Sequence, residues 1–101
     1  MKIEYVHNLT KEESYKKAQE FFPILAQKYG SDISDPEIQW ISDYQANYKI
    51  RIKGFSVKGS ILLKDYTLVI EGKIPWKIRV FEPLIFGHIK KGLDELLKES
   101  T

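Results

Sequence analysis

Apolar and polar residues alternate along three consecutive stretches between residues 46 and 74. A period of two predicts strands that each bury one face. The junctions Lys53-Gly54 and Lys64-Asp65 have the length of two-residue hairpin turns, which predicts an antiparallel meander of three strands. With these turns every inward position is apolar or glycine, whereas a one-residue slip would bury lysine and arginine.

Two further strands are predicted outside the meander. Met1 to His7 alternates weakly and predicts a short first strand. Glu37 to Ile41 predicts a strand before the meander, with Ile38 and Trp40 on its inward face.

A capping box predicts where the first helix begins. The Thr10 hydroxyl can accept from the Glu13 N–H while Glu13 reaches back to the Thr10 N–H, so the helix starts at Lys11. Gly30 is expected to end it. Pro23 lies inside this stretch and lacks a backbone donor, which predicts a kink near 19–23 or two helices meeting there.

A second helical stretch starts at Glu82-Pro83, where proline suits the first turn. Apolar residues then recur at helical spacing from Ile85 to Leu97. The predicted order is strand, helix, four strands and helix (β-α-β-β-β-β-α). Because the sheet has one apolar face, both helices must cover that face, which predicts an α+β fold in a single domain, 1–101.

Composition excludes several classes of function. The chain has 101 residues and no cysteine, which removes disulfides, thiolate metal sites and thiol nucleophiles. The first residues lack the apolar core of a signal peptide, and no apolar run is long enough to span a membrane. These features predict a cytoplasmic protein. A net charge of +2 is too small to indicate nucleic acid by itself.

No catalytic, metal or cofactor motif is visible in the sequence. His7 and His88 are not in a metal-ligand spacing; we expect His7 to make local hydrogen bonds and His88 to lie at the surface or its boundary. The acidic cluster at 32–37 lacks the ligand spacing of a calcium loop. No nucleophile motif or phosphate-binding glycine loop occurs. The expectation is a protein that is not an enzyme and has no cofactor.

The outward face of the predicted meander is rich in bases. The predicted register sets Lys58 between Lys49 and Glu71, and Lys53 and Lys64 at the turns. This face could bind anions, or it could be a solvated surface whose lysines oppose aggregation. Nucleic acid is disfavoured because no exposed aromatic platform accompanies the bases. The candidate anion-binding residues are Lys49, Arg51, Lys53, Lys58 and Lys73.

Aromatic residues are expected between the sheet and the helices, either as a filled core or around an apolar ligand. Glycines at positions 59, 72, 87 and 92 could leave room for such a ligand. On the outer face, Leu62 and Val69 are candidates for a homodimer contact. The candidate ligand-binding residues are Trp40, Tyr48, Phe55, Trp76, Phe81 and Phe86, and Tyr66 is expected in the same space.

Several stretches of the chain carry a family resemblance. They are 7–10 with Glu13, then Gly30 and Trp40, then 54–59, 68–75, 81–84 and 89–97. In these stretches the chain resembles the polyhydroxyalkanoic acid system proteins, also called the polyhydroxyalkanoate granule-region family. The resemblance implies no enzymatic activity and suggests storage-granule components as partners. The element order also resembles a reduced helix-grip domain, a fold that cradles lipids.

Three functional hypotheses follow. The first is a non-enzymatic cytoplasmic accessory or binding protein of the granule-region type. The second is a binder of a small apolar molecule between sheet and last helix, and the third is an anion or nucleic-acid binder through the basic outer face.

Overall fold

The computed structural model describes residues 1–97 and contains one antiparallel sheet in the order β1-β5-β4-β3-β2. The predicted α+β fold is therefore confirmed. The strands are β1 (Lys2–Val6), β2 (Ile33–Ser42), β3 (Gln45–Ile52), β4 (Phe55–Lys64) and β5 (Thr67–Gly72). The helices are α1 (Lys11–Ala18), α2 (Phe21–Lys28), the 3₁₀ helix η1 (Trp76–Phe81) and α3 (Glu82–Leu97).

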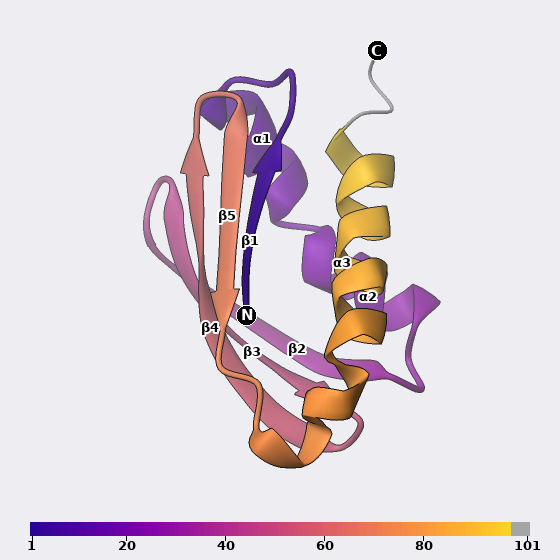
Figure 1. Ribbon diagram of the computed structural model, residues 1–101. Coiled ribbons are helices and arrows are strands. Elements are labelled where there is room, and N and C mark those ends of the chain that lie inside the picture. Colours follow the sequence, from indigo (N-terminus) through magenta and orange to yellow (C-terminus); the bar gives the residue numbers. More distant parts are fainter. Residues whose placement is uncertain (98–101) are drawn as a thin grey trace.

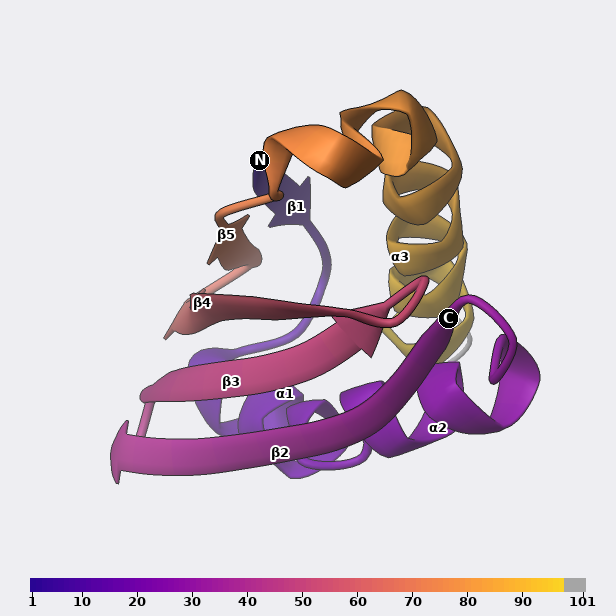
Figure 2. The same ribbon diagram turned by 90° about the horizontal axis from the view of Figure 1, so that it is seen from below.

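All helices lie on one side of the sheet, as predicted, and the sheet curls toward α3 (Figures 1 and 2). The side chains between the two layers form one apolar core, to which every strand and helix contributes. Among residues 1–97 no helix lies on the opposite face of the sheet (Figure 2). Polar side chains on that face are therefore free to meet solvent or a ligand.

The first predicted hairpin is confirmed. Ile52 faces Phe55 and Ile50 faces Val57 across β3 and β4. The two turn residues both have positive φ, 52° at Lys53 and 85° at Gly54, as a type I′ turn requires.

The second predicted turn was wrong by one residue, which shifts the register of β4 and β5 by two. The turn residues are Asp65 and Tyr66, with Lys64 facing Thr67, so that β5 begins later than predicted. The turn is held by groups distant in sequence, because the Tyr66 N–H donates to the Leu9 carbonyl oxygen at 2.9 Å. Since a shift of two residues keeps each side chain on the same face, the inward set from Leu63 backward is unchanged.

The first helical stretch contains two helices, one of the two outcomes predicted for Pro23. The capping box is present: Glu13 N–H donates to the Thr10 hydroxyl, and Thr10 N–H donates to the Glu13 carboxylate. The break at Gln19 and Glu20 places Pro23 in the first turn of α2. Backbone donors in a first turn have no partner within the helix, so the missing N–H of Pro23 costs little there.

The two glycines of α3 have different surroundings. A Cβ on Gly92 would lie 2.9 Å from Leu25 Cδ2 and 3.2 Å from Phe21 Cε1, so this glycine lets α3 approach α2 closely. A Cβ on Gly87 would meet no atom within 4 Å, and this residue is exposed. Gly87 therefore weakens the helix without serving its packing.

Gly87→Ala is expected to raise the free energy of unfolding by about 1 kcal/mol, because alanine has the higher helix propensity and fits the open space. Gly92→Ala is the matched control: it gains the same propensity but must push Leu25 aside. Urea unfolding of both variants measures the difference. Equal stabilisation by the two substitutions would contradict the packing role of Gly92.

Candidate anion-binding site

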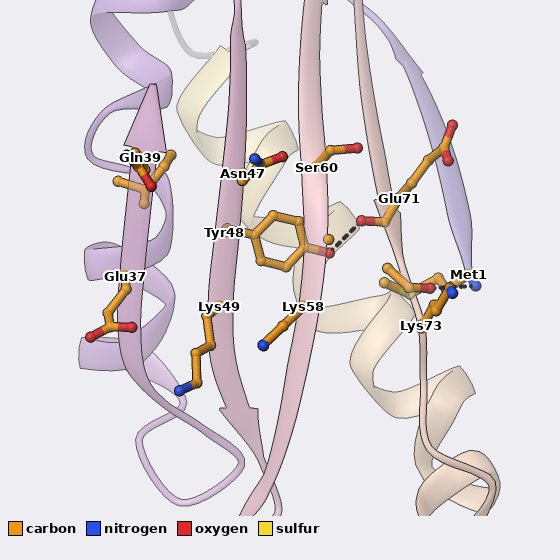
Figure 3. A pocket seen from close by; sticks show the side chains of 13 residues that line it. Met1, Glu37, Gln39, Asn47, Tyr48, Lys49, Lys58, Ser60, Glu71 and Lys73 are labelled. Carbon is orange, nitrogen blue, oxygen red and sulfur yellow. Dashed lines mark hydrogen bonds between the residues drawn. The ribbon is translucent and has the colours of Figure 1, made fainter. Parts of the chain in front are cut away.

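The uncovered face of the sheet carries an open hollow of about 1150 Å³. Polar side chains from β2, β3, β4 and β5 surround it (Figure 3). We call it the outer hollow. Its volume lies just above the roughly 300–1,000 Å³ of small-molecule clefts. Its lining includes Glu37, Gln39, Asn47, Lys49, Lys58, Ser60, Glu71 and Lys73.

Two glycines and one tyrosine determine the shape of the sheet beneath the outer hollow. Gly59 faces Gly72 across β4 and β5, and the Tyr48 ring extends beneath them to donate from its hydroxyl to the Glu71 carbonyl oxygen at 2.7 Å (Figure 3). A Cβ on Gly59 would lie only 1.9 Å from that oxygen. Burial, and then the nearby charge of Glu71, raise the pKa of Tyr48 well above its usual value, so the hydroxyl remains a donor.

Three lysines cross the outer hollow side by side. Lys49 faces Lys58 in the register of β3 and β4, and the Lys73 N–H donates to the Lys58 carbonyl oxygen at 3.3 Å. The predicted pairing of Lys58 with Glu71 was wrong, because Ser60 faces Glu71. The same two-residue shift in the β4–β5 register places Lys73 beside Lys58. We call Lys49, Lys58 and Lys73 the lysine row.

The lysine row has no ion pair within residues 1–97. The other two predicted anion-binding residues do have one. Arg51 Nε lies 3.6 Å from Asp35 Oδ2, and Lys53 Nζ lies 2.5 Å from Asp32 Oδ1. Neither Arg51 nor Lys53 lines the outer hollow. Of the five predicted bases, Lys49, Lys58 and Lys73 line the outer hollow and make no ion pair within residues 1–97.

The carboxylates at the outer hollow do not neutralise the lysine row. The Glu71 carboxylate lies 4.0 Å from Lys2 Nζ, on the side of β1. Glu37 faces Lys49 across the β2–β3 pair without an ion-pair contact between them. Like charges directly opposite in a ladder are unfavourable, and an anion lying over the row would relieve this repulsion.

Neutral hydrogen-bonding groups complete the outer hollow, and the sequence reading missed them. Gln39 faces Asn47 and Asn47 faces Ser60 in the register of β2, β3 and β4. Amide and hydroxyl groups can donate to the oxygens of an anion. Their shared position becomes visible only once the strand registers are known.

The predicted ligand-binding aromatics are not gathered around one space. Tyr48 is buried, and Trp40 and Phe81 are half-buried against the core. The predicted position between sheet and helices was wrong for Phe55, Trp76 and Phe86, which are exposed, and also for Tyr66 in its turn. Period-two alternation holds only inside a strand, and all four residues lie at a strand end, in a turn or on a helix.

The glycines that suggested an apolar cavity do not enclose one. The space at Gly59 and Gly72 is occupied by the Tyr48 ring. The space at Gly92 is occupied by Leu25 and Phe21, and Gly87 faces outward. The core between sheet and last helix is filled at the positions from which a cavity was predicted.

The two histidines lie in different surroundings. As predicted, His7 makes a local hydrogen bond: its Nδ1 accepts from the Leu9 N–H at 3.0 Å. As predicted for a boundary residue, His88 is half-buried; its Nε2 lies 3.1 Å from Asp32 Oδ2 and its ring stacks on Tyr29. Hydrogen bonds from Lys53 and then His88 lower the pKa of Asp32. This cluster joins β3, α3 and the loop before β2.

The candidate dimer contact is mostly covered within the chain. Val69 is buried although it lies on the outer face, because Leu62 and Glu4 flank it on the adjacent strands. Leu62 is itself half-buried. Among residues 1–97, no helix has the length and apolar character needed to cross a membrane.

Comparisons with known proteins give one result. Neither the curated proteins nor the solved structures contain a match to this chain. The model of a protein family, described as "Putative polyhydroxyalkanoic acid system protein", matches residues 1–97. The match covers nearly the whole chain, and it includes both the outer hollow and the helices that pack behind the sheet. The chain therefore belongs to the polyhydroxyalkanoic acid system family.

Proposed function

We propose that the protein is a non-enzymatic cytoplasmic accessory protein of the polyhydroxyalkanoic acid system, and that it binds a small multivalent anion in the outer hollow. The observation that carries the proposal is the lysine row, three lysines at neighbouring backbone positions that line the outer hollow without an ion pair in residues 1–97. Phosphate and carboxylate oxygens are the chemical groups that such a row recognises.

The size of the outer hollow favours a small anion over a nucleic-acid strand. Its base groups come from three neighbouring strands and lie over an area that one small molecule can cover. No aromatic side chain stands outward among the lysines for bases to stack on. The binding energy would come from charge and from the amide and hydroxyl donors beside the row.

Lys58→Gln removes the central charge of the lysine row and is expected to weaken binding of pyrophosphate about tenfold, the loss of one charge-assisted contact. Binding is measured by titrating pyrophosphate into isotope-labelled protein and following the backbone amide signals of 47–60 and 71–73. The affinity should also fall steeply with added salt.

Lys64→Gln provides the matched control, because Lys64 is an exposed lysine on the same strand outside the outer hollow. It should bind pyrophosphate as the unchanged protein does. Equal losses in the two variants would mean that only the overall charge attracts the anion, and would refute a site. Tighter binding of single-stranded DNA than of pyrophosphate would identify a polymer as the ligand instead.

The non-enzymatic part of the proposal has a separate test. The groups around the outer hollow include no activated nucleophile, because Ser60 has Glu71 and Asn47 opposite it and no histidine beside it. Hydrolysis of a hydroxyacyl thioester that is abolished by a single substitution in this protein would overturn this part and leave the anion site to be judged on binding.

A further inference from the structure

One end of the molecule displays large apolar side chains to solvent. Trp76 and Val80 are each 77% exposed, although tryptophan is usually well buried in folded proteins. Leu84, Phe86 and Phe55 are also exposed. Figure 1 shows η1, the first turn of α3 and the β3–β4 turn together at this end. We call these five residues the apolar tip.

The segment that carries the apolar tip is held in place from behind. Ile78 is buried and Phe81 is half-buried, three residues apart, which matches the three-residue turn of η1. Lys53 Nζ lies 5.1 Å from the centre of the Phe81 ring. Because these contacts anchor the inward side of η1 to the core, the backbone that carries the exposed side chains is held in position.

Bases accompany the apolar tip. Lys77 Nζ lies 5.9 Å from the centre of the Trp76 ring, and Arg79 follows one turn later. Within residues 1–97 neither base has an ion pair. The one acidic residue of the segment, Glu82, is half-buried. Glu82 lines a small hollow together with Arg79, so the tip combines exposed apolar groups with two bases and one acid, an excess of positive charge.

We infer that the apolar tip attaches the protein to the surface of an anionic lipid layer, with Trp76 and Val80 entering the interface and Lys77 and Arg79 meeting the headgroups. Tryptophan and aliphatic side chains beside lysine and arginine have this affinity in interfacial helices. Charge complementarity distinguishes this partner from a second copy. A two-fold contact through the tip would bring the same bases of both copies together.

The inference does not depend on the outer hollow. The lysine row lies on the open face of the sheet, whereas the tip is formed by η1, α3 and one turn. The two surfaces meet where Lys73 and Arg79 line one small hollow, which Lys58 does not line. Lys58→Gln, which tests the outer hollow, is therefore expected to leave lipid binding unchanged. Failure of one proposal leaves the other standing.

Trp76→Ser combined with Val80→Ser is expected to reduce binding to vesicles of phosphatidylcholine and phosphatidylglycerol in equal parts by about tenfold or more, because the inserted groups are lost. Co-sedimentation with the vesicles measures the bound fraction. Val6→Ser combined with Ile41→Ser removes two exposed apolar groups at the other end of the sheet and should change little. Lys77→Gln with Arg79→Gln should abolish the preference over phosphatidylcholine alone.

A fluorescence measurement can test the inference without changing any residue of the apolar tip. In a Trp40→Phe background Trp76 is the single tryptophan, and its emission should shift to shorter wavelength and be quenched by brominated lipid on vesicle binding. Vesicle binding that survives loss of Trp76 and Val80, or that leaves the Trp76 emission unchanged, overturns the inference. A shift that appears without lipid as the protein concentration rises would identify a second copy as the partner and also overturn it.

Discussion

Gly59→Ala is expected to destabilise the protein by about 3 kcal/mol. An added Cβ would lie 1.9 Å from the Glu71 carbonyl oxygen, which is backbone and cannot swing away. The same group would press on the Tyr48 hydroxyl, 2.5 Å distant, and disturb its hydrogen bond. Urea unfolding followed by circular dichroism measures the loss.

Gly72→Ala provides a more specific test of the Tyr48 position, because its Cβ would collide with a single atom, the Tyr48 hydroxyl oxygen at 2.5 Å. Removing that oxygen with Tyr48→Phe should therefore rescue Gly72→Ala and leave Gly59→Ala unrescued. A double-mutant cycle for each pair gives the coupling energy. Equal rescue of both alanines, or of neither, would contradict the arrangement of Tyr48 under the two strands.

Asp32→Asn is expected to lower the free energy of unfolding by about 2 kcal/mol, because it removes the charge that accepts from Lys53 and His88 in a half-buried site. Asp35→Asn is the matched control, since its pair with Arg51 is well exposed and longer. The control should stay within about 0.5 kcal/mol of the unchanged protein. Thermal or urea unfolding of both variants checks the difference.

The contribution of Asp32 has a defined pH window. Its pKa is lower in the folded protein than in the unfolded chain, so the unfolded chain takes up the proton first and stability falls as the pH drops below about 4. Burial lowers the pKa of His7, and a hydrogen bond with the Thr67 backbone opposes this effect. The stability contributed by neutral His7 is therefore lost at a higher pH than that of Asp32, as the pH falls below about 6.5. Asp32→Asn should reduce the lower step, to which Glu13 also contributes because hydrogen bonds with Thr10 lower its pKa, and should leave the His7 step unchanged.

Local patterns were sufficient for most of the fold. The capping box at Thr10 and Glu13 and the glycine at the first hairpin act over a few residues, and their effects were predicted correctly. The second turn was misplaced because it is held by hydrogen bonds from the Tyr66 N–H to the Leu9 carbonyl oxygen and from the Lys11 N–H to the Asp65 carboxylate. Leu9 and Lys11 are distant from the turn in sequence. Alternation alone does not distinguish registers that differ by two residues.

The site was predicted only in part for the same reason. Lys49 and Lys58 were recognised as neighbours because the short turn between β3 and β4 fixes their pairing. Lys73 was not recognised as their neighbour because the predicted register of β5 was wrong. The ion pairs of Arg51 with Asp35 in β2 and of Lys53 with Asp32 in the loop before β2 depend on contacts between segments that local patterns do not reveal. The tip was missed because the 3₁₀ turn of η1 follows no strand period.

The first strand of the chain pairs with the last one. Lys2 faces Glu71 and Val6 faces Thr67, while β2 to β5 are joined by short turns. During synthesis the ribosome releases β1 first, yet its partner is complete only after residue 72 has emerged. In that interval the strands β2 to β5 can form their hairpins, whose contacts are short in sequence. Residues 1–6 are then the last part of the sheet to form their backbone hydrogen bonds, and they lack their strand partner until β5 has emerged.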